Sequence, residues 1–136
     1  MRKIQYGLII FCLVTFSCNN LEYQIEKAHL EVMEVHDEVM PKQSTISAAQ
    51  LSIKKWLDVQ DSTQIVPPEI STLLTQLADA EEAMWSWMNQ YSKPKKSNTD
   101  EAIAYLEKQK ASIEKVRDQM LNSLTRYEDV NKKYNF

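Results

Sequence analysis

The sequence predicts an all-α domain, and the prediction rests on its turn residues, its composition and its seven-residue periodicity. The 136 residues include one glycine, Gly7, and four prolines, so few positions can supply the positive φ angles that tight β-hairpins need. Alanine, leucine, glutamate, lysine and glutamine, which lose little on entering a helix, are frequent. The length fits one domain. We therefore expect one antiparallel three-helix bundle with long, coiled-coil-like helices.

The first eighteen residues differ in kind from the rest of the chain. Arg2 and Lys3 precede an uncharged stretch from 4 to 17 that ends at Cys18. This layout is typical of a secretory signal, and the stretch is shorter than the roughly twenty residues that a membrane-spanning helix needs. Residues 14–18 (VTFSC) resemble a bacterial lipobox, whose acylated cysteine becomes the mature N-terminus. We expect a lipoprotein signal peptide over 1–17, lipid attachment at Cys18 and one helical domain over 18–136.

The cysteines and the charge indicate where the mature chain acts. Cys12 and Cys18 are the only cysteines, so the mature monomer has no pair for a disulfide. A lipid on Cys18 would hold the domain at a membrane. Neither an aspartate nor an acidic run follows Cys18, and by resemblance to Bacteroidota lipoproteins we expect the periplasmic face of the outer membrane. Removing Arg2 and Lys3 leaves 14 basic and 19 acidic residues, which disfavours nucleic acid as a partner.

The first predicted helix spans about 21–59. Its apolar residues recur every seven positions, as in a coiled-coil seam; they are Ile25, Val32, Val39, Ile46 and Ile53. The period stays in phase across Pro41, which favours one helix kinked at that proline. A proline inside a helix costs about 3 kcal/mol and disfavours helical geometry at Met40. A full break at Pro41, giving four helices, is the alternative.

Two further helices complete the predicted bundle. Pro67 and Pro68 followed by Glu69 suit a helix start, and a seven-residue repeat follows over 68–91. Ser97 with Asp100, or Asn98 with Glu101, resembles a capping box that begins a third helix over 99–132. The repeats are Ile70, Leu77, Met84 and Tyr91, then Leu106, Ile113, Met120, Tyr127 and Tyr134.

No catalytic signature is present in the sequence. It contains no nucleophile elbow, glycine-rich phosphate loop, zinc-type cysteine pair or His-Glu-x-x-His motif. His36 and Asp37 are neighbours, but adjacent helical side chains point about 100° apart, so adjacency alone does not make them a pair. We therefore expect a protein that is not an enzyme.

A stripe of histidines and methionines is the most distinctive constellation. His29, Met33, His36 and Met40 are spaced to line one side of the first helix. Thioether and imidazole groups suit copper, especially Cu(I). The candidate metal ligands are Met33, His36, Met40, Met84 and Met88. Core packing is the favoured alternative because methionine fills irregular helical cores, and we expect His29 to face solvent rather than a metal.

Three aromatic residues of the second helix, Trp85, Trp87 and Tyr91, are interpreted as packing groups rather than a ligand cage. Trp85 and Trp87 are two positions apart and cannot share one helix face, so one of them should be exposed. An exposed tryptophan beside Met84 or Met88 would mark a surface for a partner.

Two segments carry a family resemblance: residues 35–42 (VHDEVMPK) and 83–91 (AMWSWMNQY). They resemble small Bacteroidota lipoproteins that bear the family name viral A-type inclusion protein. The resemblance covers most of the chain, implies lipid attachment at Cys18 and implies no established activity. If the two segments meet, His36, Met40, Met84 and Met88 would converge at the Pro41 kink.

Three functions are compatible with these patterns. The favoured one is a membrane-anchored helical binding or assembly module of the cell envelope, whose partner is a protein or a second copy. The heptad seams, the acidic surface and the lack of a catalytic set favour it. The alternatives are copper or haem binding through His36 and the methionines, and a structural envelope spacer with no concave site.

Overall fold

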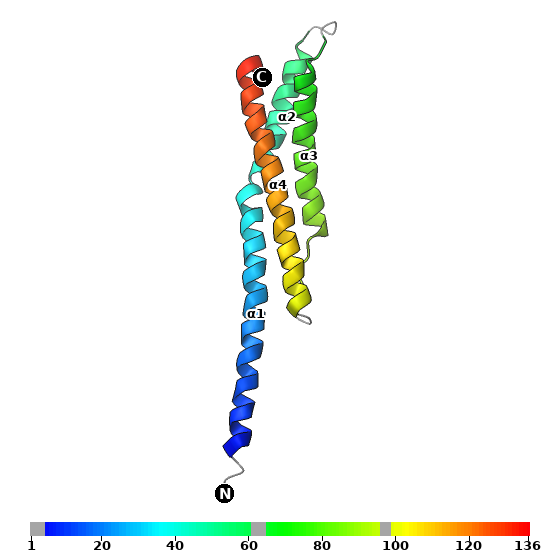
Figure 1. Cartoon of the computed structure of the whole chain (residues 1–136). Helices are drawn as coiled ribbons and strands as arrows, with labels where there is room; N and C mark the ends of the chain where they lie inside the picture. Colours follow the sequence, from blue (N-terminus) through cyan, green and yellow to red (C-terminus); the bar gives the residue numbers. More distant parts are fainter. Residues whose placement is uncertain (1–4, 61–64, 96–98) are drawn as a thin grey trace.

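The protein is an all-α bundle built from four helical segments. The computed structural model describes residues 5–60, 65–95 and 99–136, with side chains from 21 onward and not at Thr99. The segments are α1 (Gln5–Val39), α2 (Lys42–Asp58), α3 (Pro68–Gln90) and α4 (Thr99–Tyr134). In Figure 1, α1 and α2 follow each other along a rod, α3 returns beside α2, and α4 runs alongside all three. The described residues contain no strand, which confirms the predicted fold class.

Pro41 bends the first helix without turning the chain back. The two segments on either side of it are inclined by 30°, so α1 and α2 together form one kinked helix. Pro41 itself keeps helical angles, with φ −61° and ψ −21°, but it lacks an N–H and its ring crowds the carbonyl four residues earlier. The Gln43 N–H therefore donates to the Met40 carbonyl at 3.1 Å, a tighter turn than in an α-helix. The predicted kink, rather than a full break, is confirmed.

Helix boundaries differ from the expected ones mainly at the N-terminus. α1 begins at Gln5 instead of about residue 21, and its first turns project beyond the ends of α3 and α4 (Figure 1). α3 ends one residue before the expected position and α4 ends two residues after it. Residues 97 and 98, the expected capping positions of α4, lie outside the described residues, as does the side chain of Cys18.

The core follows the seven-residue seams. Most seam residues are fully buried, among them Val32, Val39, Ile46, Ile53, Ile70, Leu77, Leu106, Ile113 and Met120, while the tyrosines of the seams are partly buried. α4 packs against α1, α2 and α3, so it is the central element of the bundle. The amphipathic faces bury apolar area that favours folding by about 25 cal/mol per Å².

Polar contacts between helices fix the register of this packing. Glu69, in the first turn of α3, accepts hydrogen bonds from Arg126 at 2.8 Å and Lys133 at 2.9 Å, both on α4. The Lys133 hydrogen bond holds the pKa of the Glu69 carboxyl below its usual value. On the other side of α3, Glu81 accepts from Ser47 and Gln50 of α2 at 2.9 Å and 3.0 Å.

Core truncation tests this packing. Leu77 is fully buried on α3, so Leu77→Ala should remove both transfer free energy and packing contacts. We expect a loss of about 2 to 5 kcal/mol in the free energy of unfolding, measured by urea denaturation. Leu30→Ala is the matched control because Leu30 is exposed on α1, and it should change stability by less than about 0.5 kcal/mol. Equal losses in the two variants would contradict the observed core.

Candidate functional site

His36 lies on the last turn of α1 and packs on α3. Its ring stacks on the Trp87 indole with centroids 5.7 Å apart and planes inclined by 29°. Its Nδ1 also donates to Asp37 Oδ1 at 2.9 Å, so the neighbours do pair, although adjacency alone gave no reason to expect it. Trp87 is only 6% exposed, and its Nε1 has no hydrogen-bond partner among the described residues.

Tyr91 extends this contact into an aromatic stack where α3 ends. Its backbone leaves the helix with ψ 133°, and its ring packs against Trp87 of the last turn. It stacks on Trp87 at 4.8 Å and 18°, and on Tyr105 of α4 at 6.4 Å and 23°. A continuous series of stacked rings therefore joins α1, α3 and α4 where α3 ends.

His29 belongs to the same stack, and the expectation that it faces solvent was wrong. It is half-buried, lies parallel to Tyr91 with centroids 6.1 Å apart, and shares a 2.6 Å hydrogen bond between Nδ1 and the Tyr91 hydroxyl. Burial lowers the pKa of the His29 imidazole, and the Lys93 ammonium lowers it further, against a smaller opposing effect of Glu26. Lys93 in turn forms an ion pair with Glu26 of α1 at 2.8 Å. Residues 91–93, which directly follow α3, are therefore held against α1.

Three of the four methionines of the predicted metal site, Met40, Met84 and Met88, lie in or against the core. Met84 is fully buried, Met40 and Met88 pack against the core, and Met33 is half-buried. Met84 lies between Glu81, which bonds to α2, and Trp87, which stacks on α1. The antiparallel register thus places Met84 opposite the Pro41 bend. These positions support the core-packing interpretation of the methionines.

Histidine, cysteine and acidic side chains form no metal-binding cluster in the described part of the chain. No three histidine, cysteine, aspartate or glutamate side chains within it lie close enough together to hold an ion. One buried polar group near the bend does lack a partner: Gln43 is 8% exposed, and neither its Oε1 nor its Nε2 is hydrogen-bonded. Sequence reasoning missed it because Gln43 falls outside the seven-residue seams.

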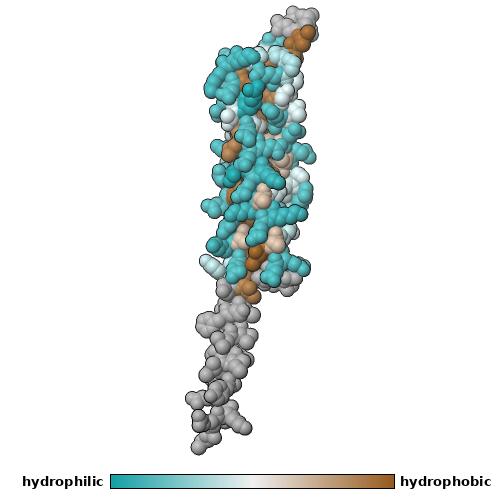
Figure 2. Space-filling model, viewed as in Figure 1, coloured by the Kyte–Doolittle hydropathy of each residue, from teal (hydrophilic) through white to brown (hydrophobic). Residues whose placement is uncertain are grey.

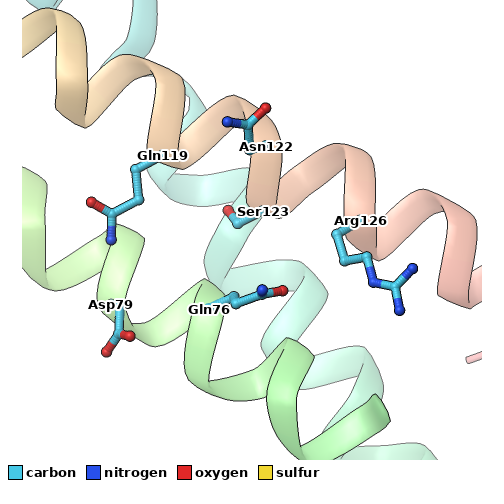
Figure 3. A pocket seen from close by; sticks show the side chains of 6 residues that line it. All are labelled: Gln76, Asp79, Gln119, Asn122, Ser123 and Arg126. Carbon is cyan, nitrogen blue, oxygen red and sulfur yellow. The ribbon is translucent and has the colours of Figure 1, made fainter.

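A polar pocket of about 280 Å³ lies between α3 and α4. Only hydrogen-bonding side chains line it (Figure 3); they are Gln76, Asp79, Gln119, Asn122, Ser123 and Arg126. The sequence contained one overlooked signal for it. Ser123 is polar at a buried position of α4, whereas the residues seven positions before and after it, Val116 and Val130, are buried and apolar.

Apolar side chains are exposed at the end of the rod where α2 leads into α3. Ile65 is 91% exposed, Val59 is 80% exposed, and Val66 is also exposed. We call these three residues the tip patch, and Figure 2 shows hydrophobic colour at this end of an otherwise mostly hydrophilic face. Near the end of α3, Trp85 is 49% exposed while Trp87 is buried, which confirms that one of the two tryptophans faces outward.

Comparisons with protein-family models, with curated proteins and with solved structures returned no match. The resemblance of residues 35–42 and 83–91 to small Bacteroidota lipoproteins therefore stays a prediction. Within the described residues, no helix is both long and apolar enough to cross a membrane.

The environment of His29 predicts a pH-dependent stability. Because burial and Lys93 lower the pKa of folded His29, the unfolded chain takes up the proton first as the pH falls below about 6.5. The free energy of unfolding should then decrease, since the unfolded state binds more protons than the folded state. Urea denaturation at about pH 7.5 and about pH 5.5 should show a smaller decrease for His29→Gln than for the unchanged chain. The same decrease in both proteins would show that His29 contributes nothing.

A Cu(I) competition titration tests the copper hypothesis directly. Because Met84 is fully buried and His36 is held by Trp87 and Asp37, we expect no stoichiometric complex. The double substitution His36→Ala, Met40→Ala should instead lower the free energy of unfolding by about 2 kcal/mol through lost packing. The packing interpretation would be contradicted if the chain bound one Cu(I) tightly and the double variant lost this binding. The core control Met120→Leu should in that case still bind Cu(I).

Proposed function

We propose that this chain is a lipid-anchored lipoprotein of the bacterial cell envelope, without catalytic activity, that presents an apolar tip to a protein partner. The single observation that carries the proposal is that the two ends of the rod differ. The N-terminus lies at one end of α1, and the tip patch lies at the opposite end of the molecule (Figures 1 and 2).

The N-terminal sequence supports the anchor. Arg2, Lys3, the uncharged stretch and the lipobox-like residues before Cys18 suit export and acylation. Two or three acyl chains contribute roughly 0.8 kcal/mol for each buried methylene, which suffices for stable attachment. We place the anchored chain at the periplasmic face of the outer membrane, following the resemblance to Bacteroidota lipoproteins.

The kinked helix sets how far the tip reaches from the anchor. α1 and α2 carry the chain from Cys18 to Asp58 with one 30° bend. At 1.5 Å per residue this corresponds to about 60 Å. A lipid on Cys18 would therefore hold the tip patch well away from the membrane surface, where a partner in the envelope space can meet it.

The chemistry of the tip suits a protein partner. Single exposed apolar residues are common on protein surfaces and need no explanation. Val59 and Ile65, however, are both largely exposed and both lie in the connection between α2 and α3. Beside them, Trp56, Leu57 and Pro67 line a small notch of about 20 Å³ with Ile65 and Val66. Clustered apolar groups on an otherwise charged rod are typical of the centre of a protein interface.

Site-specific crosslinking in the native bacterium tests anchor and tip together. A photo-crosslinking amino acid at Val66 should give one discrete adduct, and the double substitution Val59→Asp, Ile65→Asp should abolish it by placing charge in the contact. Membrane fractionation of the same cells should move the chain to the soluble fraction when Cys18→Ala is introduced. The adduct mass distinguishes a second copy of the chain from another protein.

The matched control places the crosslinker at Lys108, an exposed position on α4 away from the tip. It should give no discrete adduct. Equal crosslinking from Lys108 and Val66, or an adduct insensitive to the tip substitutions, would contradict a binding tip. Retention of Cys18→Ala in the membrane fraction would contradict the lipid anchor.

A further inference from the structure

The polar pocket between α3 and α4 is separate from the tip patch and from the aromatic stack. Gln76 and Asp79 come from α3, and the other four lining residues come from α4. Figure 3 shows Gln119 extending toward α3 on the side of Asp79, with Arg126 at the opposite end of the group. The pocket is therefore an elongated trough with an acid at one end and a base at the other.

Most of the hydrogen-bonding groups around the trough face solvent, because every lining residue except Ser123 is exposed. No hydrogen bond or ion pair within the described chain involves the side chain of Gln76, Asp79, Gln119 or Asn122. Arg126 gives one N–H to Glu69 at 2.8 Å, and a guanidinium has five N–H donors. Three amides, one carboxylate and one guanidinium thus retain free donors and acceptors around a single hollow.

The floor of the trough is made by a residue that breaks the apolar pattern. Ser123 is 4% exposed and stands in the buried seam of α4, where Val116 and Val130 occupy the preceding and following positions. Its hydroxyl donates to the Met120 carbonyl of its own helix at 2.8 Å. Because serine is smaller than valine, a hollow of about 280 Å³ that opens to solvent remains between the two helices there.

The spacing of the charges indicates the length of a fitting ligand. Gln119, beside Asp79, and Arg126 are seven residues apart on α4, which is about 10 Å along the helix axis. An extended peptide advances about 3.3 to 3.6 Å per residue. A chain of about three residues therefore spans the distance between the acidic and the basic end.

We propose that this trough binds a short extended peptide with free termini. Asp79 pairs with its ammonium group, Arg126 pairs with its carboxylate, and Gln76, Gln119 and Asn122 exchange hydrogen bonds with its backbone amides. Charge-assisted bonds at both ends favour the zwitterion over a capped peptide. No aromatic ring lines the trough, so it lacks the stacking platform that would favour a sugar.

The test uses trialanine as the probe and the full 136-residue chain in mild detergent. Titration followed by two-dimensional ¹⁵N–¹H spectra should show saturable shifts at residues 76–79 and 119–126. Acetylated trialanine amide, which lacks both charges, should bind at least about tenfold more weakly. Asp79→Asn and Arg126→Gln should each weaken trialanine binding by about the same factor.

Two further variants separate binding from folding. Ser123→Val should fill the floor of the trough and abolish the shifts while the thermal midpoint is maintained or raised. Asp118→Asn and Lys132→Gln remove equivalent charges from α4 outside the pocket, and both should bind trialanine as the unchanged chain does. Absent shifts, equal binding of the capped peptide, preferential binding of glucose, or insensitivity to Asp79→Asn and Arg126→Gln would each overturn the proposal.

Discussion

The rest of the structure depends on a seven-residue apolar seam that stays in phase across Pro41. Val39 and Ile46, the seam residues on either side of the proline, are both fully buried. The bend changes the direction of the helix by 30° but not the face that it presents to the bundle. A slip of even one residue would rotate the face of α2 by about 100° and bring its polar side chains into the core. The kink therefore redirects α2 toward α3 while preserving one continuous core.

The different lengths of the helices explain why aromatic residues gather where α3 ends. α3 has 23 residues and α4 has 36, so α3 cannot cover the lower part of α1 and α4. Tyr91 leaves the helix in an extended conformation and closes that end with Trp87, Tyr105 and His29. The flat rings bury a large area without another helical turn. His29 is desolvated in the process, which is the physical origin of its lowered pKa.

The sequence predicted the features that depend on local spacing and missed those that depend on rotation between helices. Periodicity and proline positions are local signals, so the fold class, the kink and the start of α3 could be predicted. The sequence required that one of Trp85 and Trp87 be exposed, but the choice depends on how α3 rotates against α1. The partner of His29 is a tyrosine 62 residues away, and no local pattern indicates that contact. For the same reason the trough was not predicted, although Ser123 is a polar residue between the buried valines Val116 and Val130 of the same series.

The trough is compatible with a stable α3–α4 interface because strong contacts lie on both sides of it. Toward the start of α3, Glu69 joins Arg126 and Lys133. Toward the end of α3, Tyr91 stacks on Tyr105. Each contact restrains the helix spacing over several turns, so the loss of apolar packing at Ser123 stays local. Replacing a buried valine-sized group by serine lowers the stability of a core, so helix packing alone does not account for serine at position 123.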